Sequence, residues 1–177
     1  MQSEEDGSVV VIRQETPKDI AGVRHVNEQA FGRAAEADLV DRLRTRGKVM
    51  LSLVAVQDDR VVGHILFSSV TVESEGTAFP AVGLAPMAVL PELQRQGIGS
   101  RLVEIGLEEC RNAGHACVVV LGHSEYYPRF GFVPASTYGI TCEYDVPDEA
   151  FMAVELWQGA LLGHGGTAKY QPEFNEG

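Results

Sequence analysis

The sequence predicts an α/β fold with a mixed sheet, and two observations lead to this prediction. First, short β-branched runs and amphipathic helical periods alternate along the chain, which is the pattern of helices packed on a sheet. Second, a helix connects a strand at residues 82–90 to a strand at residues 116–121, and such a crossover joins its two strands in parallel. The second of these runs is apolar at every position, as expected for a strand covered on both faces.

The first elements are a strand and two helices. Residues 9–13 are mainly β-branched and too few for a helix, so they predict a strand. Residues 16–19 combine a hydroxyl, a proline and an acid, which is typical of a helix start. A second helix is predicted over residues 35–46, because its apolar positions follow the helical period and it ends at Gly47.

The rest of the chain continues with strands. The polar turn at residues 58–60 separates two of them and favours a tight hairpin. The further predicted elements are strands at residues 51–57, 61–72, 82–90, 116–121 and 151–157 and a helix at about 97–112. At 177 residues we expect one domain, at residues 9–158, with a flexible tail at 1–8 and a Gly-rich tail at 159–177.

Charge and composition narrow the choice of partners. The net charge of −11 argues against nucleic acid and against an anionic membrane surface, and it favours a cationic partner such as an amine. No run approaches the ~18 apolar residues of a membrane span, and the N-terminus lacks a secretory pattern. Cys110, Cys117 and Cys142 have no metal-type spacing, so we expect free thiols, no bound metal and a cytoplasmic protein.

One segment carries most of the functional information, because a strand turns directly into a helix at residues 87–100. A helix start exposes about four unpaired N–H groups with a partial positive charge, and phosphate is their natural ligand. Gly97 and Gly99 have no side chain to keep a pyrophosphate from these amides, and Ser100 adds a hydroxyl. Other phosphate signatures fit less well, because Leu102 replaces the third glycine of G-x-G-x-x-G. The alternative is that these glycines serve packing alone.

The Q-x-x-G-x-G of Gln94–Gly99, after a strand that ends Met87-Ala88-Val89, resembles motif A of the GNAT superfamily of acyl-CoA-dependent N-acyltransferases. Tyr127-Pro128-Arg129-Phe130-Gly131-Phe132 is similar to the Tyr-x-x-x-Gly-Phe of that family. The resemblance implies a mostly antiparallel central sheet flanked by helices, with the parallel crossover at the acetyl-CoA site. It also makes a homodimer plausible, although no sequence feature establishes one.

The resemblance implies a role for each matching residue. Backbone groups of Met87, Ala88 and Val89 would pair with the pantetheine arm, and Phe130 would pack beside it. Gln94 stands at the leading position of the motif. The pyrophosphate would be held by amides of Arg95, Gln96, Gly97, Ile98, Gly99 and Ser100. Tyr127 falls at the general-acid position of the family.

The chemistry of amine acylation explains a tyrosine at this place. Only about 4 in 10,000 lysine-like amines are neutral at pH 7, so a proton must be accepted before attack on the thioester. The leaving thiolate then gains from a donor such as the Tyr127 phenol, for which the adjacent Tyr126 is an alternative. His123 could act as a base or be an exposed loop histidine. Glu28 and His64 are candidates for contact with the acceptor amine, or else structural residues.

Two other functions remain as alternatives. The run from Gly122 to Tyr126 nearly spells the G-x-S-x-G elbow of a serine hydrolase around Ser124, but Tyr126 replaces its last glycine and Pro128 interrupts the helix that should follow. A non-catalytic acyl-CoA-binding or regulatory domain would keep the glycine segment without turnover. The sequence does not identify the acceptor amine, which could be a small molecule or a protein, nor the length of the acyl group, for which acetyl is the expectation.

Overall fold

The computed structural model describes residues 9–176, so the tail predicted at residues 1–8 lies outside the described residues. The described chain forms two compact units. Unit 1 comprises residues 9–66 and 86–106, and unit 2 comprises residues 67–85 and 107–176. Each unit is therefore assembled from stretches that are separate in the sequence.

The helices lie where their patterns predict them, and the long strands do as well. The α-helices are α1 (Ile20–Phe31), α2 (Ala35–Thr45) and α3 (Ile98–Asn112). The strands are β2 (Val11–Gln14), β3 (Val49–Gln57), β4 (Arg60–Ser74), β5 (Thr77–Val89), β6 (Cys117–Leu121), β7 (Val133–Pro134), β8 (Ile140–Cys142), β9 (Phe151–Glu155) and β10 (Gly166–Lys169).

In unit 1 the strands follow the spatial order β2-β3-β4-β5. Strands β2 and β3 are antiparallel, with Val11 opposite Val56. Strands β3 and β4 are joined by Asp58 and Asp59 alone, and both residues have positive φ angles, of 52° and 62°. A two-residue connection with positive φ at both positions is typical of a type I′ hairpin turn. The predicted hairpin is thereby confirmed.

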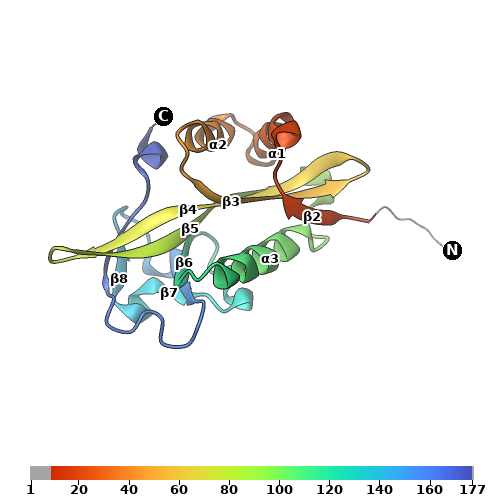
Figure 1. The fold of residues 1–177 in the computed structure, drawn as a ribbon. Coiled ribbons are helices and arrows are strands. Elements are labelled where there is room, and N and C mark those ends of the chain that lie inside the picture. The colour runs from red at the N-terminus through yellow and green to blue at the C-terminus, as the bar shows by residue number, and fades with distance from the viewer. Residues whose placement is uncertain (1–8, 177) are drawn as a thin grey trace. The chain divides into compact units, whose positions relative to one another are not determined.

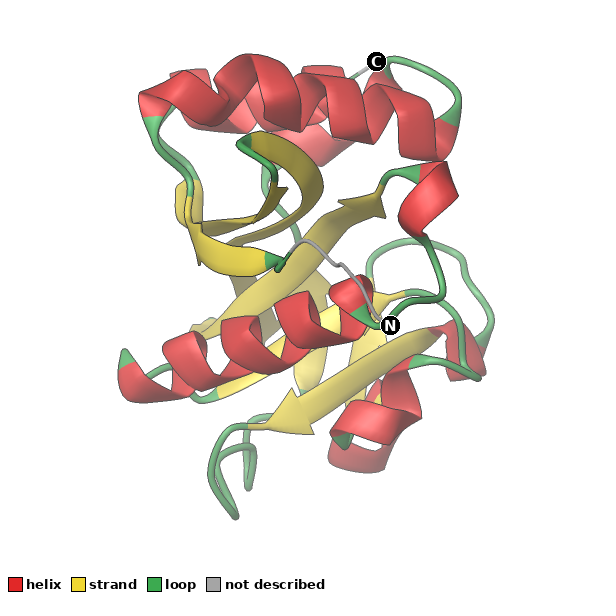
Figure 2. Ribbon diagram, turned by 90° about the vertical axis from the view of Figure 1, so that its right-hand side faces the viewer, coloured by secondary structure: helices red, strands yellow, loops and turns green. Residues whose placement is uncertain are grey.

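Helices cover both faces of the strands of unit 1. Helices α1 and α2 lie over one face and α3 over the other (Figure 1 and Figure 2). Each helix buries one apolar stripe, because its hydrophobic residues repeat with the helical period. These buried residues, all at 5 % exposure or less, are Val23, Val26, Ala37, Val40, Leu43, Ile98, Leu102 and Val103.

In unit 2 the order is β4-β5-β6-β9-β7. Strand β6 pairs with β5 in parallel, with Val82–Leu84 opposite Val118–Val120, which confirms the crossover predicted from the sequence. Strand β9 pairs with β6 antiparallel along its whole length. The sheet is therefore mixed, and β6 is buried from Cys117 to Val120 as its uniformly apolar sequence predicted.

The sequence did not predict the strands β7, β8 and β10. Residues 159–177 were expected to be a Gly-rich tail, but β10 within them pairs with β4 antiparallel and with β8 in parallel. Ala168 of β10 is fully buried in the core of unit 2. These three strands have no β-branched run comparable to that of residues 9–12, so only their partners in the fold define them.

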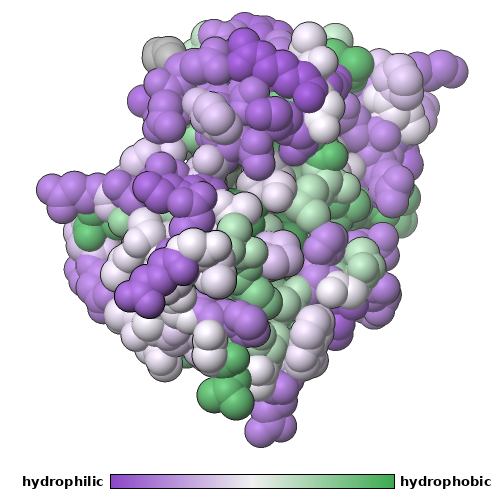
Figure 3. All heavy atoms as spheres, turned by 60° about the vertical axis from the view of Figure 1, so that its left-hand side comes forward, coloured by the Kyte–Doolittle hydropathy of each residue, from purple (hydrophilic) through white to green (hydrophobic). Residues whose placement is uncertain are grey.

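The surface of the described chain is ordinary for a folded protein. Hydrophilic atoms prevail on the face drawn in Figure 3, and hydrophobic atoms form smaller patches between them. Large hydrophobic side chains that remain exposed include Trp157 at 50 % and Leu162 at 83 %. Among residues 9–176, no helix is both long and apolar enough to cross a membrane.

Candidate functional site

The residues Gln94–Ser100, called here the phosphate segment, lead into helix α3 in unit 1. The backbone N–H of Arg101 donates to the carbonyl of Gly97 at 3.0 Å, so Gly97 is the capping residue just before helix α3, which begins at Ile98. The amides of Ile98 and Gly99 therefore belong to the first turn, where an α-helix provides no carbonyl four residues earlier. Residues 94–97 are exposed. The geometry is that of a helix entrance open to an anion.

The backbone of the phosphate segment is held in an unusual conformation. Arg95 has a φ of 66° and Gly97 a φ of 88°. A non-glycine residue at positive φ costs of the order of 1 kcal/mol, and such strain clusters at ligand-binding positions. A Cβ atom added to Gly97 would meet no other atom within 4 Å, so the space beside this glycine is open. These residues fit a pyrophosphate, because residues 94–97 are exposed and the space beside Gly97 is open.

The side chain of Gln94 connects the phosphate segment to the end of strand β5 by a hydrogen bond. Its side-chain Nε2 donates to the carbonyl of Val89 at 3.0 Å. The pairing of β6 with β5 covers Val82–Leu84, and β5 runs beyond it to Val89. Met87 is half-buried, while Ala88 and Val89 are buried. Pro86 has no N–H to donate, which is typical of a place where strand pairing ends.

In unit 2 the residues Gly122–Phe132, called here the tyrosine segment, follow strand β6. Tyr127 is only 7 % exposed, and its ring meets Tyr126 and Phe132 edge to face, at centroid distances of 5.0 and 5.6 Å. Tyr127 also begins the short 3-10 helix Tyr127–Phe130. Burial raises the pKa of Tyr127 to about 12, with a smaller contribution from Tyr126. The phenol is therefore protonated at neutral pH and can donate a proton or a hydrogen bond.

The structure distinguishes the two adjacent tyrosines. Tyr126 is half-buried, and the guanidinium of Arg129 lies over its ring at 4.6 Å. The ring of Phe130 is 5.3 Å from the Tyr126 ring and 6.4 Å from the Tyr127 ring. Tyr126 thus forms part of the cover over Tyr127, and Tyr127 is the residue with a strongly raised pKa.

His123 and Ser124 are both exposed. The carbonyl of His123 accepts the backbone N–H groups of Tyr126 and Tyr127, at 3.1 and 3.3 Å, so this residue shapes the turn. A nucleophile elbow places its serine on a strained turn before a helix. Ser124 is not among the residues with positive φ, and a short 3-10 helix follows it. This geometry speaks against a serine hydrolase.

His64 lies inside unit 1, with no exposed surface. Its Nδ1 is 3.1 Å from Asn27 Nδ2, and its Nε2 is 2.9 Å from Ser52 Oγ. An amide nitrogen can only donate, so Nδ1 accepts and Nε2 carries the proton. Burial, helped by the charge of Arg44, lowers the pKa of His64 to about 3, so the ring is neutral. A buried histidine with both nitrogens engaged is a structural residue rather than a surface for an acceptor.

Glu28 is half-buried on helix α1 and forms an ion pair with Arg24 at 3.1 Å. Arg24 also contacts Asp38 at 2.8 Å and Asp41 at 2.7 Å, both on helix α2. This network ties the two helices together. Because it is partly exposed, each pair contributes only about 0.2–1 kcal/mol.

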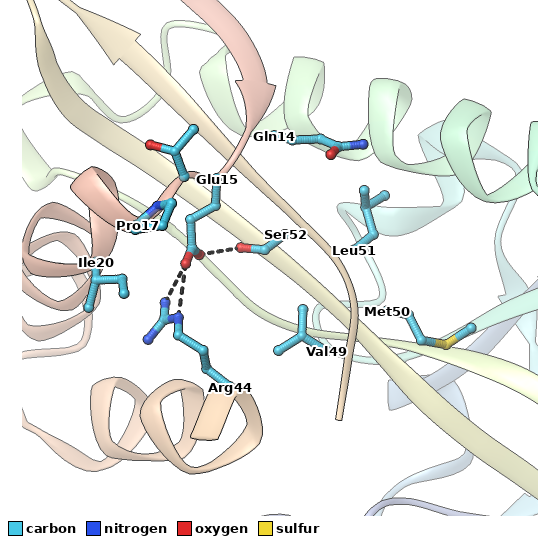
Figure 4. Close-up of a pocket in the computed structure, with 10 residues that line it drawn as sticks. Gln14, Glu15, Pro17, Ile20, Arg44, Val49, Met50, Leu51 and Ser52 are labelled. Atoms are coloured by element: carbon cyan, nitrogen blue, oxygen red, sulfur yellow. Dashed lines mark hydrogen bonds and ion pairs between the residues drawn. The ribbon is translucent and has the colours of Figure 1, made fainter. Parts of the chain in front are cut away.

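A pocket of about 300 Å³ in unit 1 contains none of the predicted site residues (Figure 4). Glu15 stands at its centre, where Arg44 contacts one carboxylate oxygen at 2.8 Å and Ser52 donates to the other at 2.6 Å. Figure 4 shows Arg44 and Ser52 converging on this carboxylate. This network could not be predicted from local patterns, because Arg44 and Ser52 lie 29 and 37 residues from Glu15 in the sequence. The carboxylate already accepts hydrogen bonds from two protein donors, Arg44 Nε at 2.9 Å and Ser52 Oγ, so we interpret the network as structural.

The predicted site residues fall into two groups. The residues of the phosphate segment and Met87, Ala88 and Val89 belong to unit 1, as do Glu28 and His64, while Tyr127, Phe130 and His123 belong to unit 2. Within residues 9–176, no group of histidine, cysteine and acidic side chains is arranged to hold a metal ion. The three cysteines are free, and burial raises the pKa of Cys110 and Cys117 to about 12. These two thiols are therefore unreactive at neutral pH.

The known proteins that this chain resembles agree with the geometry of the site. Residues 11–135 match the family model described as an acetyltransferase (GNAT) domain. The chain is 37% identical over 167 residues to the uncharacterized N-acetyltransferase YhbS of Escherichia coli strain K12, covering 94% of this chain and 99% of that one. It is 42% identical over 134 residues to the uncharacterized N-acetyltransferase YjhQ of the same strain, covering 74% of each.

Solved structures agree with these relatives. The crystal structure of Escherichia coli YhbS in complex with CoA superposes with a TM-score of 0.91 at 35% identity, covering 99% of this chain and 97% of that one. A GNAT family acetyltransferase from Brucella melitensis in complex with acetyl-CoA superposes with a TM-score of 0.77 at 34% identity, covering 94% and 98%. The family match, the relatives and the fold lead to one conclusion: this chain belongs to the GNAT family of N-acetyltransferases.

Proposed function

We propose that this chain transfers an acetyl group from acetyl-CoA to a primary amine by direct attack. The observation that carries the proposal is the entrance of helix α3, where Gly97 combines a positive φ of 88° with open space beside it. The crystal structures of two relatives, at 34 and 35% identity, contain acetyl-CoA and CoA, and this supports the same co-substrate here. No metal is part of the proposal.

Each residue of the phosphate segment has a part in binding. The amides of residues 95–100 receive the pyrophosphate, and the Ser100 hydroxyl lies at the same helix entrance. The backbone of Met87, Ala88 and Val89 pairs with the pantetheine arm, as an extended chain does with a strand. Phe130 packs beside the co-substrate. Gln94 acts indirectly, because its bond to the Val89 carbonyl connects the strand end to the loop.

The reaction follows from the chemistry of a thioester. The neutral amine nitrogen attacks the carbonyl carbon, whose oxygen gains charge and is stabilised by a backbone amide near Val89. The C–S bond of the tetrahedral intermediate then breaks, and the Tyr127 phenol donates its proton to the leaving sulfur. The amine proton leaves to water, and the Tyr127 phenolate takes a proton back from water, which restores the phenol for the next cycle. His123 is a candidate base for this last step because it is exposed.

The acceptor is an amine that carries positive charge before it reacts, and the net charge of −11 supports this choice. Half-buried Glu28 is the candidate for contact with it. The free cysteines support a cytoplasmic protein. A homodimer stays a prediction, which sedimentation velocity would test.

The test is a panel of amines incubated with acetyl-CoA. The panel contains spermidine, kanamycin, free lysine, a peptide with a free N-terminus and a peptide with an internal lysine. We expect amine-dependent release of free thiol together with an acetylated product in the mass spectrum. Thiol release that does not depend on any amine would show hydrolysis of the thioester and contradict transfer to an amine. No release at all despite CoA binding would favour a non-catalytic acyl-CoA-binding domain.

Binding is tested separately by NMR. Saturating CoA should shift the amide signals of residues 95–100 more than those of other exposed loops. If these signals stay in place, the assignment of the phosphate segment is wrong, whatever the turnover.

A further inference from the structure

Gly122 follows strand β6 directly, and its backbone is anchored there. Its N–H donates to the carbonyl of Ala150 at 2.9 Å. Gly122 is not among the glycines with positive φ, so its backbone conformation is open to other residues. If a glycine is required at this position, the reason is therefore the space beside it and not the backbone conformation.

The space beside Gly122 is filled by the ring of Tyr127. A Cβ atom added to Gly122 would lie 2.6 Å from Cε2, 3.1 Å from Cδ2 and 3.6 Å from Cζ of that ring. The first distance is far shorter than the 3.5–4.0 Å at which carbon atoms attract one another. The ring thus rests directly on the backbone of Gly122. Cζ, the carbon that bears the phenol oxygen, is among the three atoms nearest to the missing methyl group.

The Tyr127 ring is also enclosed by other aromatic side chains. Phe132, which is 1 % exposed, meets it edge to face at 5.6 Å, and Tyr126 does so at 5.0 Å. The backbone of Tyr127 is tied to the carbonyl of His123 at 3.3 Å. A side chain at Gly122 would therefore force the ring to move against packed neighbours, and the phenol oxygen would move with it.

We infer that Gly122 is a positioning residue for the proposed reaction: the absence of its side chain sets where the Tyr127 hydroxyl stands. This inference rests on the proposed role of Tyr127 as the proton donor. It gives a function to the glycine that, in the sequence, only suggested a hydrolase elbow.

A double-mutant cycle tests the inference. The substitutions are Gly122→Ala, Tyr127→Phe and both together, assayed with acetyl-CoA and whichever amine of the panel above has the highest turnover. Gly122→Ala should lower kcat by about tenfold or more, because misplacing a reacting group by about 1 Å can cost 10²-fold. The KM for acetyl-CoA should change by less than about twofold. In the Tyr127→Phe background, Gly122→Ala should have almost no further effect on kcat.

Two kinetic outcomes would overturn the inference. One is a Gly122→Ala variant with unchanged kcat. The other is an equal loss of kcat in both backgrounds, because the methyl group would then act on something other than the hydroxyl. If Tyr127→Phe itself leaves kcat unchanged, the proposed role of Tyr127 fails, and the NMR measurement below still decides whether Gly122 places the ring.

NMR follows the ring itself, with the tyrosines labelled at Cζ. In the unsubstituted protein, the Hα protons of Gly122 should show cross-relaxation with the Tyr127 ring and a ring-current shift. The pKa of Tyr127, held near 12 by burial, should fall toward 10 in Gly122→Ala as the ring gains solvent. Absence of the cross-relaxation, or an unchanged pKa in a folded Gly122→Ala variant, contradicts the inference.

A matched control separates crowding in general from crowding of Tyr127. Gly22→Ala introduces a similar contact in unit 1, 2.9 Å from the Cβ of Val61, and should leave kcat unchanged. If Gly122→Ala does not fold, Tyr127→Leu in the same chain removes the ring and should restore folding. Failure to restore it would place the clash elsewhere and refute the inference.

Discussion

The phosphate segment and the tyrosine segment present their proposed functional groups in different ways. In the phosphate segment these groups are backbone amides, the residues 94–97 are exposed, and the glycine at its centre has open space beside it. In the tyrosine segment the group is one hydroxyl on a ring that is 7 % exposed and packed by Phe132 and Gly122. A site built from backbone amides should tolerate substitution of its side chains unless bulk or charge is added. A site built from a packed side chain should lose function when a neighbouring residue is substituted.

The largest effect is expected at Tyr127. Tyr127→Phe removes the proton donor and keeps the packed ring, so kcat should fall by about 10²–10⁴-fold. The dissociation constant for acetyl-CoA, measured by calorimetry, should change by less than about twofold. Tyr126→Phe serves as the control, since it should retain most of the turnover. Loss of acetyl-CoA binding in Tyr127→Phe would contradict the division of binding and catalysis between the two segments, because the tyrosine segment would then also bind the co-substrate.

The next effect is expected at Gly97. Gly97→Glu puts a carboxylate beside the proposed pyrophosphate, and the dissociation constant of acetyl-CoA should rise by about 10–100-fold. Gly32→Glu is the matched control, because Gly32 also has a positive φ, of 69°, and no atom within 4 Å of an added Cβ. Both substitutions should cost about 1 kcal/mol of stability from backbone strain. If both weaken binding equally, the effect is strain, and the anion site is refuted.

A third prediction concerns His64, which is also a packed side chain and whose protonation state depends on pH. Its folded pKa of about 3 is below the unfolded value of about 6.5, so between these values the unfolded chain binds the extra proton. The contribution of neutral His64 to the free energy of unfolding is therefore complete above pH 6.5, and it decreases as the pH falls toward 3. We expect a loss of about 2 kcal/mol from pH 6.5 to 5, measured by urea unfolding. His64→Gln should remove this slope, and an unchanged slope would assign it to other groups.

The smallest effect is expected at Gln94. Gln94→Ala removes the hydrogen bond to the Val89 carbonyl and is worth about 0.5–1.5 kcal/mol. The dissociation constant of acetyl-CoA should rise by about two- to tenfold, with kcat little changed. Gln94→Glu sharpens the test, since a carboxylate cannot donate to that carbonyl and should be at least as harmful. An effect on kcat alone would show that Gln94 belongs to the catalytic step.

Much of the fold could be predicted because its signals are local. The apolar periods of α1, α2 and α3 and the uniformly apolar β6 are contiguous patterns, and each was found within a few residues of its predicted bounds. The turn at Asp58-Asp59 was predicted from its polar residues alone. The short strands were missed for the opposite reason, since β10 is defined by pairing with residues far away in the sequence.

The residues of the candidate site also divide into those that a local pattern predicts and those that only tertiary contacts decide. Gly97 was predicted because a glycine before a helix is a local signal, and the structure places it at positive φ with free space. The fate of His64 could not be predicted, because its partner Asn27 lies 37 residues away in the sequence. The role of Gly122 could not be predicted either, because a glycine in a loop has many uses and only a contact selects among them.

The sequence by itself determined the order of helices and long strands, the parallel crossover and the position of the phosphate segment. These follow from hydrophobic period, capping residues and backbone freedom, all of which act over a few neighbouring residues. The tertiary structure alone decided that Tyr127 is the buried tyrosine of its pair, that His64 is enclosed and neutral, and that Gly122 leaves room for a ring. Burial and contact depend on chain segments that meet only in the folded state, so no local pattern encodes them.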